Sequence, residues 1–168
     1  MEYVNRCVKF RLPNGNVVDI LEPVISEMLN WLQNTQSAPE GCGFLMGYNN
    51  KYKQNITLSA LTTPQRNDER TRFFCKLRDK IHFRILSDNR KNENYYMGVW
   101  HTHPQEIPSP SLIDWNDWYE SLKKDNAGAE YAFFIIAGVC EFRVWAGEKT
   151  TGTIVEIFEA EKVDSIYL

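Results

Sequence analysis

The chain has 168 residues, of which 43% are hydrophobic and 24% are charged, with a net charge of -3. This length and composition predict one folded domain over residues 1–168 and argue against disorder or two domains of ordinary size. The acidic balance gives no reason to expect nucleic acid as a partner, and no apolar run reaches the ~20 residues that a membrane-spanning helix requires.

The first half of the chain predicts strands on both sides of a helix. The turn Pro13-Asn14-Gly15-Asn16 joins two alternating segments and is typical of a β-hairpin. Apolar residues then recur at helical spacing, with Pro23 near the start of that segment. A glycine-rich apolar run after Pro39 indicates a buried strand. The expected elements are strands at 3–11 and 16–20, a helix at 22–34, and strands at 41–47 and 54–61.

The second half predicts a loop, two helices and four strands. Residues 62–71 are polar and charged and contain Pro64, so we expect an exposed, solvated loop. Gly138 and Gly147 mark the last two turns. The other expected elements are a helix at 78–91, a strand at 95–101, a helix beginning at Ser111, and strands at 130–137, 140–146 and 153–160. This order predicts an α+β domain with a single mixed β-sheet flanked by helices.

The cysteines give little sign of a disulfide framework. Four are present, far apart and without a CxxC pair: Cys7, Cys42, Cys75 and Cys140. The N-terminal residues alternate polar with apolar and do not resemble a signal peptide. Without a secretion signal, an even number of cysteines is weak evidence for disulfides. We therefore expect a cytoplasmic protein with reduced cysteines.

Two of the three histidines, His101 and His103, stand two residues apart at the end of an expected strand. On extended backbone such residues project from the same face, so both imidazoles can point at one ion. If Ser111 caps the next helix, Asp114 lies in its first turn and can point back toward them. Two nitrogens and one oxygen would then occupy three corners of a zinc tetrahedron, at about 2.0–2.2 Å, and leave the fourth for water.

Amide hydrolysis also needs a group that takes a proton from water and passes it to the leaving amine. Zinc makes hydroxide available at neutral pH but does not supply this proton transfer. Glu40, just before the buried glycine-rich strand, is the first candidate for the general base. Glu106, in the proline-rich segment before Ser111, is the second, and spacing alone does not choose between the two.

The residues His101-Thr102-His103-Pro104, followed by Ser111 and Asp114, resemble the HxH-x7-S-x2-D signature of the JAMM (JAB1/MPN/Mov34) zinc metalloprotease family. The run Pro39-Glu40-Gly41-Cys42-Gly43 is similar to that family's upstream glutamate. The resemblance implies the MPN/JAB, cytidine-deaminase-like architecture and a peptidase or isopeptidase activity. It also implies residue roles: Zn2+ ligands at His101, His103 and Asp114, a general acid/base at Glu40, and an oxyanion donor at Ser111.

The chain further resembles the small bacterial JAB-domain proteases of CBASS antiphage operons. The resemblance implies a substrate made from the C-terminal tail of a conjugated protein, either a ubiquitin-like protein or a cyclic-nucleotide synthase. The ligase of the same operon is a further expected partner. The features that carry this likeness are Thr63-Pro64, Asp68, Arg70-Thr71-Arg72-Phe73, Gly98-Val99-Trp100, Pro108-Ser109-Pro110-Ser111 and Trp118.

Several alternatives stay open at this point. Ser111 is also a preferred helix N-cap, with Asp114 where a capping-box partner would stand. His82 is expected to pack or face solvent, and Cys42 to be an inert buried residue and not a nucleophile. Other functions to weigh are a peptidase for a ubiquitin-like sulfur carrier, a non-catalytic interaction module, and a zinc nuclease or phosphoesterase. In the leading hypothesis the substrate tail binds as an added β-strand along a sheet edge.

Overall fold

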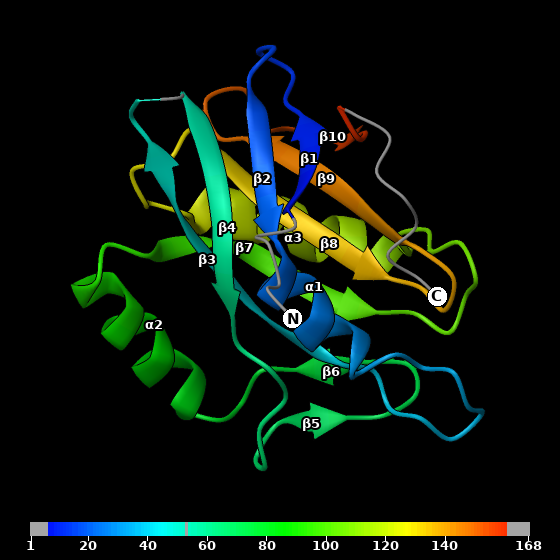
Figure 1. Ribbon diagram of the computed structural model, residues 1–168. Helices are drawn as coiled ribbons and strands as arrows, with labels where there is room; N and C mark the ends of the chain where they lie inside the picture. The colour runs from blue at the N-terminus through cyan, green and yellow to red at the C-terminus, as the bar shows by residue number, and fades with distance from the viewer. Residues whose placement is uncertain (1–6, 53, 161–168) are drawn as a thin grey trace, which may run out of the picture.

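The computed structural model describes residues 7–52 and 54–160. An eight-stranded mixed sheet with the strand order β1-β2-β4-β3-β7-β8-β9-β10 carries three helices (Figure 1). This confirms the α+β class, and a separate two-stranded sheet, β5–β6, is an addition to the expected single sheet. The elements are β1 Cys7–Arg11, β2 Val17–Leu21, α1 Glu22–Leu29, β3 Cys42–Asn50, β4 Asn55–Leu61, β5 Glu69–Arg70, β6 Cys75–Lys76, α2 Ile81–Lys91, β7 Tyr95–Thr102, α3 Leu112–Lys124, β8 Tyr131–Ala137, β9 Phe142–Glu148 and β10 Thr153–Ile157.

The N-terminal hairpin forms as expected. β1 and β2 pair antiparallel around a turn in which Gly15 has a φ of +88°, a conformation that favours glycine. Residues 3–6 of the expected first strand lie outside the described residues. The helix that follows is shorter than predicted: α1 ends at Leu29, not at residue 34. The side chain of Gln33 is the reason, because it is buried and hydrogen-bonded to loop carbonyls, a placement that a continued helix would not allow.

The strand β8 lies between the two hydrophobic cores of the molecule. Its side chains alternate, so Phe133 and Ile135 enter one core and Phe134 and Ile136 the other. Helix α1 covers the first core, and α3 covers the second with Trp118 (Figure 1). Each fully buried side chain of this size stabilises the fold by about 1.5–3 kcal/mol. β7 pairs parallel with β8 between these two layers, and it carries His101 and leads directly into His103.

The two ends of the large sheet meet. After β10 the chain crosses to β1, where the Arg11 N–H donates to the Phe158 carbonyl at 2.9 Å and the Ala160 N–H donates to the Lys9 carbonyl at 2.8 Å. The last expected strand therefore ends at Ile157, and residues 158–160 pair with the first strand instead. The turn predicted at Gly147 is wrong as well, since this glycine lies inside β9.

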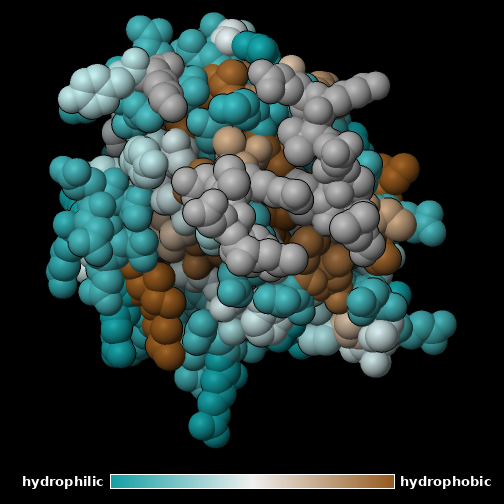
Figure 2. Space-filling model, in the orientation of Figure 1, coloured by the Kyte–Doolittle hydropathy of each residue, from teal (hydrophilic) through white to brown (hydrophobic). Residues whose placement is uncertain are grey.

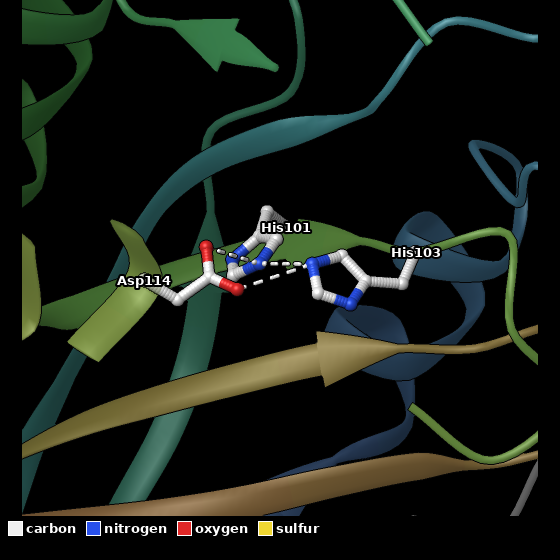
Figure 3. Close-up of side chains that lie close together, drawn as sticks. All are labelled: His101, His103 and Asp114. Atoms are coloured by element: carbon white, nitrogen blue, oxygen red, sulfur yellow. Dashed lines mark hydrogen bonds and ion pairs between the residues drawn. The ribbon is translucent and has the colours of Figure 1, made fainter. Parts of the chain in front are cut away.

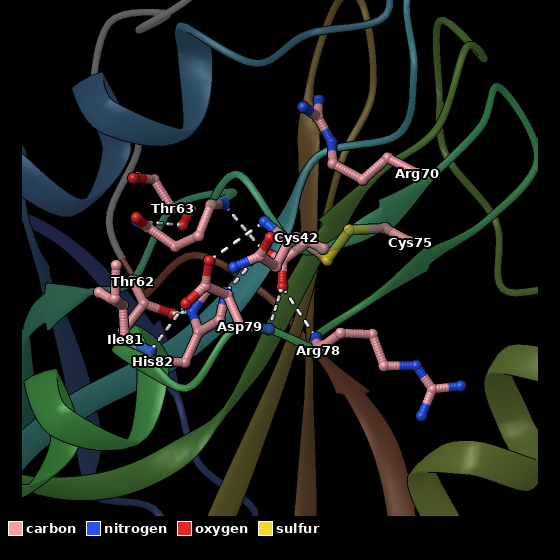
Figure 4. A network of polar contacts seen from close by, with 12 residues as sticks. Cys42, Thr62, Thr63, Arg70, Cys75, Arg78, Asp79, Ile81 and His82 are labelled. Carbon is pink, nitrogen blue, oxygen red and sulfur yellow. Dashed lines mark hydrogen bonds and ion pairs between the residues drawn. A yellow bond between two sulfur atoms is a disulfide. The ribbon is translucent and has the colours of Figure 1, made fainter.

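Residues 62–71 are only in part the exposed loop that their polarity predicts: Arg66, Asn67, Glu69 and Thr71 are exposed, but Thr62, Pro64 and the Asp68 side chain are buried. The Asp68 side chain is fully buried, with an oxygen 2.6 Å from His82 Nε2, and it accepts hydrogen bonds from three backbone N–H groups, those of Gln65, Arg78 and Asp79. His82 is fully buried, and its Nδ1 lies 2.8 Å from the Thr62 hydroxyl (Figure 4). One charge of this segment, that of Asp68, is thus satisfied in the interior by His82 and by backbone N–H groups, which a composition-based argument cannot detect.

The expectation of four reduced cysteines is wrong for one pair. Cys42 on β3 and Cys75 on β6 form a disulfide (Figure 4). Their Cα atoms are 6.0 Å apart, in the range that a disulfide bridges. The turn of residues 71–74 returns β6 alongside β5, and the Glu40 N–H donates to the Thr71 carbonyl in this turn, which ties the hairpin to the segment just before β3. This pairing depends on tertiary structure, because 33 residues separate the two cysteines.

The face drawn in Figure 2 is largely hydrophilic, with small apolar areas between polar side chains. In the described part of the chain, none of the helices combines the length and apolar character needed to cross a membrane.

Candidate metal centre and active site

The two histidines converge at the end of β7. His101 is the second-last residue of β7, and His103 directly follows the strand. The side chain of Thr102, between them, is fully buried on the opposite face of the strand. The two Nε2 atoms are 3.1 Å apart. The His103 ring is also held from behind, because its Nδ1 lies 3.1 Å from the Gln105 amide oxygen. The alternation of an extended strand therefore produces the paired imidazoles, as the sequence predicted.

Asp114 joins the histidines from helix α3. Its Oδ1 lies 3.2 Å from His101 Nε2, and its Oδ2 lies 3.2 Å from His103 Nε2 (Figure 3). The helix begins with a capping box in which the Asp114 N–H donates to Ser111 Oγ at 3.1 Å and the Ser111 N–H donates to Asp114 Oδ2 at 2.7 Å. The cap fixes the rotamer of Asp114 and aims its carboxylate at the two rings.

The electrostatics of the cluster favour a carboxylate beside cationic groups. Burial would raise the pKa of Asp114, but hydrogen bonds from both histidines outweigh burial and lower the pKa far below its usual range. Burial would lower the pKa of His103, and its hydrogen bond with Asp114 raises it instead. The site thus stabilises a positive charge placed between Asp114 and the two imidazoles.

These three residues fit a metal ion. The ligand atoms of His101, His103 and Asp114 lie within 4.8 Å of one another, and this group forms a candidate metal site. Ligands bound at about 2.0–2.2 Å to a tetrahedral ion stand roughly 3.3–3.6 Å from one another. The two Nε2 atoms, 3.1 Å apart, are close to such an edge, and each lies 3.2 Å from a different oxygen of the Asp114 carboxylate. Two neutral imidazoles and a carboxylate are also the donor set of an open, catalytic zinc site.

Glu40 lies in the same cleft as this cluster. Its side chain is 8% exposed, and burial raises its pKa from 4.5 to about 7, an effect that the nearby His101 and His103 partly oppose. The backbone of Glu40 is held by the turn after β5, because its N–H donates to the Thr71 carbonyl at 2.8 Å and its carbonyl accepts from Arg70 Nε at 2.7 Å. A carboxyl with a pKa near neutrality can both accept and return a proton.

The cleft has a volume of about 610 Å³ and separates the β5–β6 hairpin from the start of α3. Ser111 lines it together with Glu40 and the three cluster residues. Glu106, the second candidate base, is exposed and does not line this cleft. His82 is remote from the cluster and bonded within its own network. Hairpin residues that line the cleft are Arg72, Phe73, Phe74, Cys75 and Lys76.

Two buried residues beside the site have no role that sequence patterns predict. Thr102 and Gln33 are hydrogen-bonded to each other at 2.9 Å beneath the histidines. Strand alternation could have shown that Thr102 points away from the ion. No sequence signal identifies Gln33, because the helical spacing places it inside the predicted helix at 22–34.

Comparison with known proteins finds relatives that match most of the chain. Two related proteins are each named "CD-NTase/cGAS isopeptidase". The one from Escherichia coli is 26% identical over 145 residues, covering 84% of this chain and 88% of its own. The one from Vibrio cholerae serotype O1 is 29% identical over 149 residues, covering 83% of this chain and 86% of its own.

The solution structure of protein DSY2949 from Desulfitobacterium hafniense shares the fold, with a TM-score of 0.53 and 19% sequence identity. The match covers 86% of this chain and 90% of that chain. Residues 21–150 match the model of a family described as prokaryotic homologs of the JAB domain (Prok-JAB). Since this match spans most of the sequence, the chain belongs to the prokaryotic JAB-domain family.

Proposed function

We propose that this protein is a zinc-dependent isopeptidase. It cleaves the bond between the C-terminal tail of a conjugated protein and the target to which that tail is attached. The observation that carries the proposal is the convergence of His101, His103 and Asp114 in one cleft with the buried carboxyl of Glu40. Three ligands and one open position are the pattern of a hydrolytic zinc site, and a neighbouring carboxyl supplies the acid–base chemistry.

The residues of the chain divide the work of hydrolysis among them. A zinc ion held by the three ligands would acidify water and polarise the scissile carbonyl. Glu40 takes the proton of the attacking water and returns it to the leaving lysine amine. In the metal-free protein, burial raises the pKa of this carboxyl from 4.5 to about 7. Ser111 caps α3 with an oxygen lone pair, so its hydroxyl hydrogen stays available for the oxyanion of the substrate.

The cleft fits an extended peptide. Phe73 on the hairpin is 85% exposed and Ile113 on α3 is 71% exposed, and both line the cleft. An extended tail between these apolar side chains would bring its terminal carbonyl to the cluster and could pair with the edge of the β5–β6 hairpin. The names of the two relatives support a CD-NTase/cGAS conjugate as the substrate. We propose that the tail is the C-terminus of such a cyclic-nucleotide synthase, and that the reaction reverses the ligase of a CBASS antiphage system.

The test is hydrolysis of defined conjugates. Purified protein is incubated with a lysine conjugate of a synthase C-terminus and with conjugates of ubiquitin-like tails, including a sulfur carrier, with and without chelator. We expect release of the synthase tail, loss of activity with chelator, and recovery with Zn2+. Glu40→Ala should lower turnover by ~10²–10⁴ while zinc stays bound, and Glu106→Ala is the matched control.

Three outcomes would contradict the proposal. If cleavage continued in the presence of chelator, the reaction would not depend on a metal. Equal losses in Glu40→Ala and Glu106→Ala would remove Glu40 from its role as base. Binding of every conjugate without cleavage would favour a non-catalytic interaction module.

A further inference from the structure

We propose that Thr102 is a positioning residue that holds Glu40 in register with the imidazole pair. The inference deepens the proposed function and depends on it, because it concerns how the same site is assembled. Thr102 stands between His101 and His103, and its side chain is fully buried on the face of β7 turned away from the ligand atoms. It therefore contacts no reacting atom and acts through the segment that bears the base.

Thr102 holds both backbone groups of Gly41, the residue next to Glu40. Its hydroxyl oxygen accepts from the Gly41 N–H at 2.8 Å, and its own N–H donates to the Gly41 carbonyl at 2.9 Å. The methyl group also packs there, because Thr102 Cγ2 lies 3.4 Å from the place that a Cβ on Gly41 would occupy. The ligand-bearing strand and the base-bearing segment are thus joined directly at this side chain.

The hydroxyl hydrogen of Thr102 extends the connection to a second buried residue. It donates to Gln33 Oε1 at 2.9 Å, and Gln33 Nε2 donates to the carbonyls of Ala38, at 3.2 Å, and Arg72, at 2.9 Å. Gln33 is 2% exposed, so water cannot replace these bonds. The network fixes the chain on both sides of Glu40: the approach at Ala38 and the exit at Gly41.

This arrangement matters because acid–base catalysis is sensitive to placement. A shift of about 1 Å in a catalytic group can cost ~10²-fold in rate. Removing the Thr102 hydroxyl leaves the Gly41 N–H and Gln33 Oε1 without their partner in a dry environment, and the segment is expected to shift to find others. The ligand atoms of the histidines point to the opposite face, so metal binding should persist.

The test compares Thr102→Val with Thr102→Ser and with a matched control, Thr62→Val. Valine keeps the shape and removes the hydroxyl. Thr62 is 1% exposed, and its hydroxyl accepts from the Phe44 N–H on β3 at 2.8 Å, a bond of the same kind three residues after Gly41. That bond serves the His82 network and not Glu40. Measured quantities are zinc content, kcat and KM on the cleaved conjugate, and hydrogen exchange of the Glu40 and Gly41 amides.

We expect Thr102→Val to keep its zinc, to lose ~10–100-fold in kcat with KM changed less than about threefold, and to exchange both amides faster. In Thr102→Ser, kcat should be within about threefold of the parent value. The kcat of Thr62→Val should also be within about threefold of the parent value. Unchanged kcat in Thr102→Val, equal losses in both valine variants, or loss of zinc from Thr102→Val would each overturn the inference.

If the parent cleaves no conjugate, the proposed function fails, and the amide exchange still decides the inference. Faster exchange at Glu40 and Gly41 in Thr102→Val alone would support the positioning role, and equal exchange in all variants would reject it.

Discussion

Asp114 contacts three parts of the site through one carboxylate. Its oxygens lie 3.2 Å from each histidine Nε2, and one of them also accepts from the Ser111 N–H. Asp114→Asn keeps the size of the side chain and removes its charge, so zinc should be lost together with activity. Elemental analysis after dialysis measures this, with Asp117→Asn as the control, because Asp117 lines the same cleft without belonging to the cluster. Full zinc occupancy in Asp114→Asn would show that the ligand assignment is wrong.

Glu40 makes the stability of the metal-free protein depend on pH. Its pKa is raised from 4.5 to about 7 by burial, so the folded protein binds more protons than the unfolded chain between these two values. Stability is therefore lost as pH rises from about 4.5 to 7, by up to about 3 kcal/mol. Glu40→Gln has no ionisable group at this position and lacks this loss. The free energy of unfolding of Glu40→Gln, relative to that of the parent, should therefore increase as pH rises through this window. Parallel pH profiles from urea unfolding of the two proteins would contradict the burial of an ionisable Glu40.

Ser111 has two roles that one substitution can separate. Ser111→Ala removes the N-cap of α3, which costs about 0.5–2 kcal/mol of stability. If the hydroxyl also donates to the oxyanion, the reaction barrier rises by about 2.7–4 kcal/mol. Thermal unfolding and kcat/KM of the variant measure the two effects. A lower Tm with little change in rate would leave the cap as the sole role.

The β5–β6 hairpin is joined covalently to β3 by a disulfide. The disulfide between Cys42 and Cys75 closes a separation of 33 residues. A loop of this size is stabilised by roughly 3–4 kcal/mol through the restricted unfolded chain. Cys75→Ser should lower the free energy of unfolding by about that amount, and reductant should destabilise the parent but not the variant. Chemical denaturation measures both, with the exposed Cys140 substituted to serine as the control.

Local patterns predicted the elements that local patterns determine. The hairpin at Gly15, the strand before His101 and the cap at Ser111 follow from turn chemistry, alternation and spacing, and the structure has all three. The early end of α1 at Leu29 and the Cys42–Cys75 bond could not be predicted, because each depends on a neighbour distant in the chain. The same limit applied to the site: the signature gave the candidate residues, and only the fold places Thr102 and Gln33 beneath them.

For the whole molecule, the pairing of residues 158–160 with β1 should contribute measurably to the free energy of unfolding. The backbone bonds from Arg11 to Phe158 and from Ala160 to Lys9 are worth about 0.5–1.5 kcal/mol each. A chain that ends at Ile157 should therefore be less stable by about 1–3 kcal/mol than one that ends at Ala160. Equilibrium unfolding of the two truncated chains measures the difference. Equal stabilities would mean that the pairing adds nothing.

The same pairing also affects how copies of this protein meet one another. A row of unpaired N–H and carbonyl groups on an outer strand can recruit an identical strand from another molecule. Here residues 158–160 of the same chain occupy that position along Lys9 and Arg11. The protein thus occupies this stretch of its first strand with its own chain, so these backbone groups are not open to β-pairing with another copy.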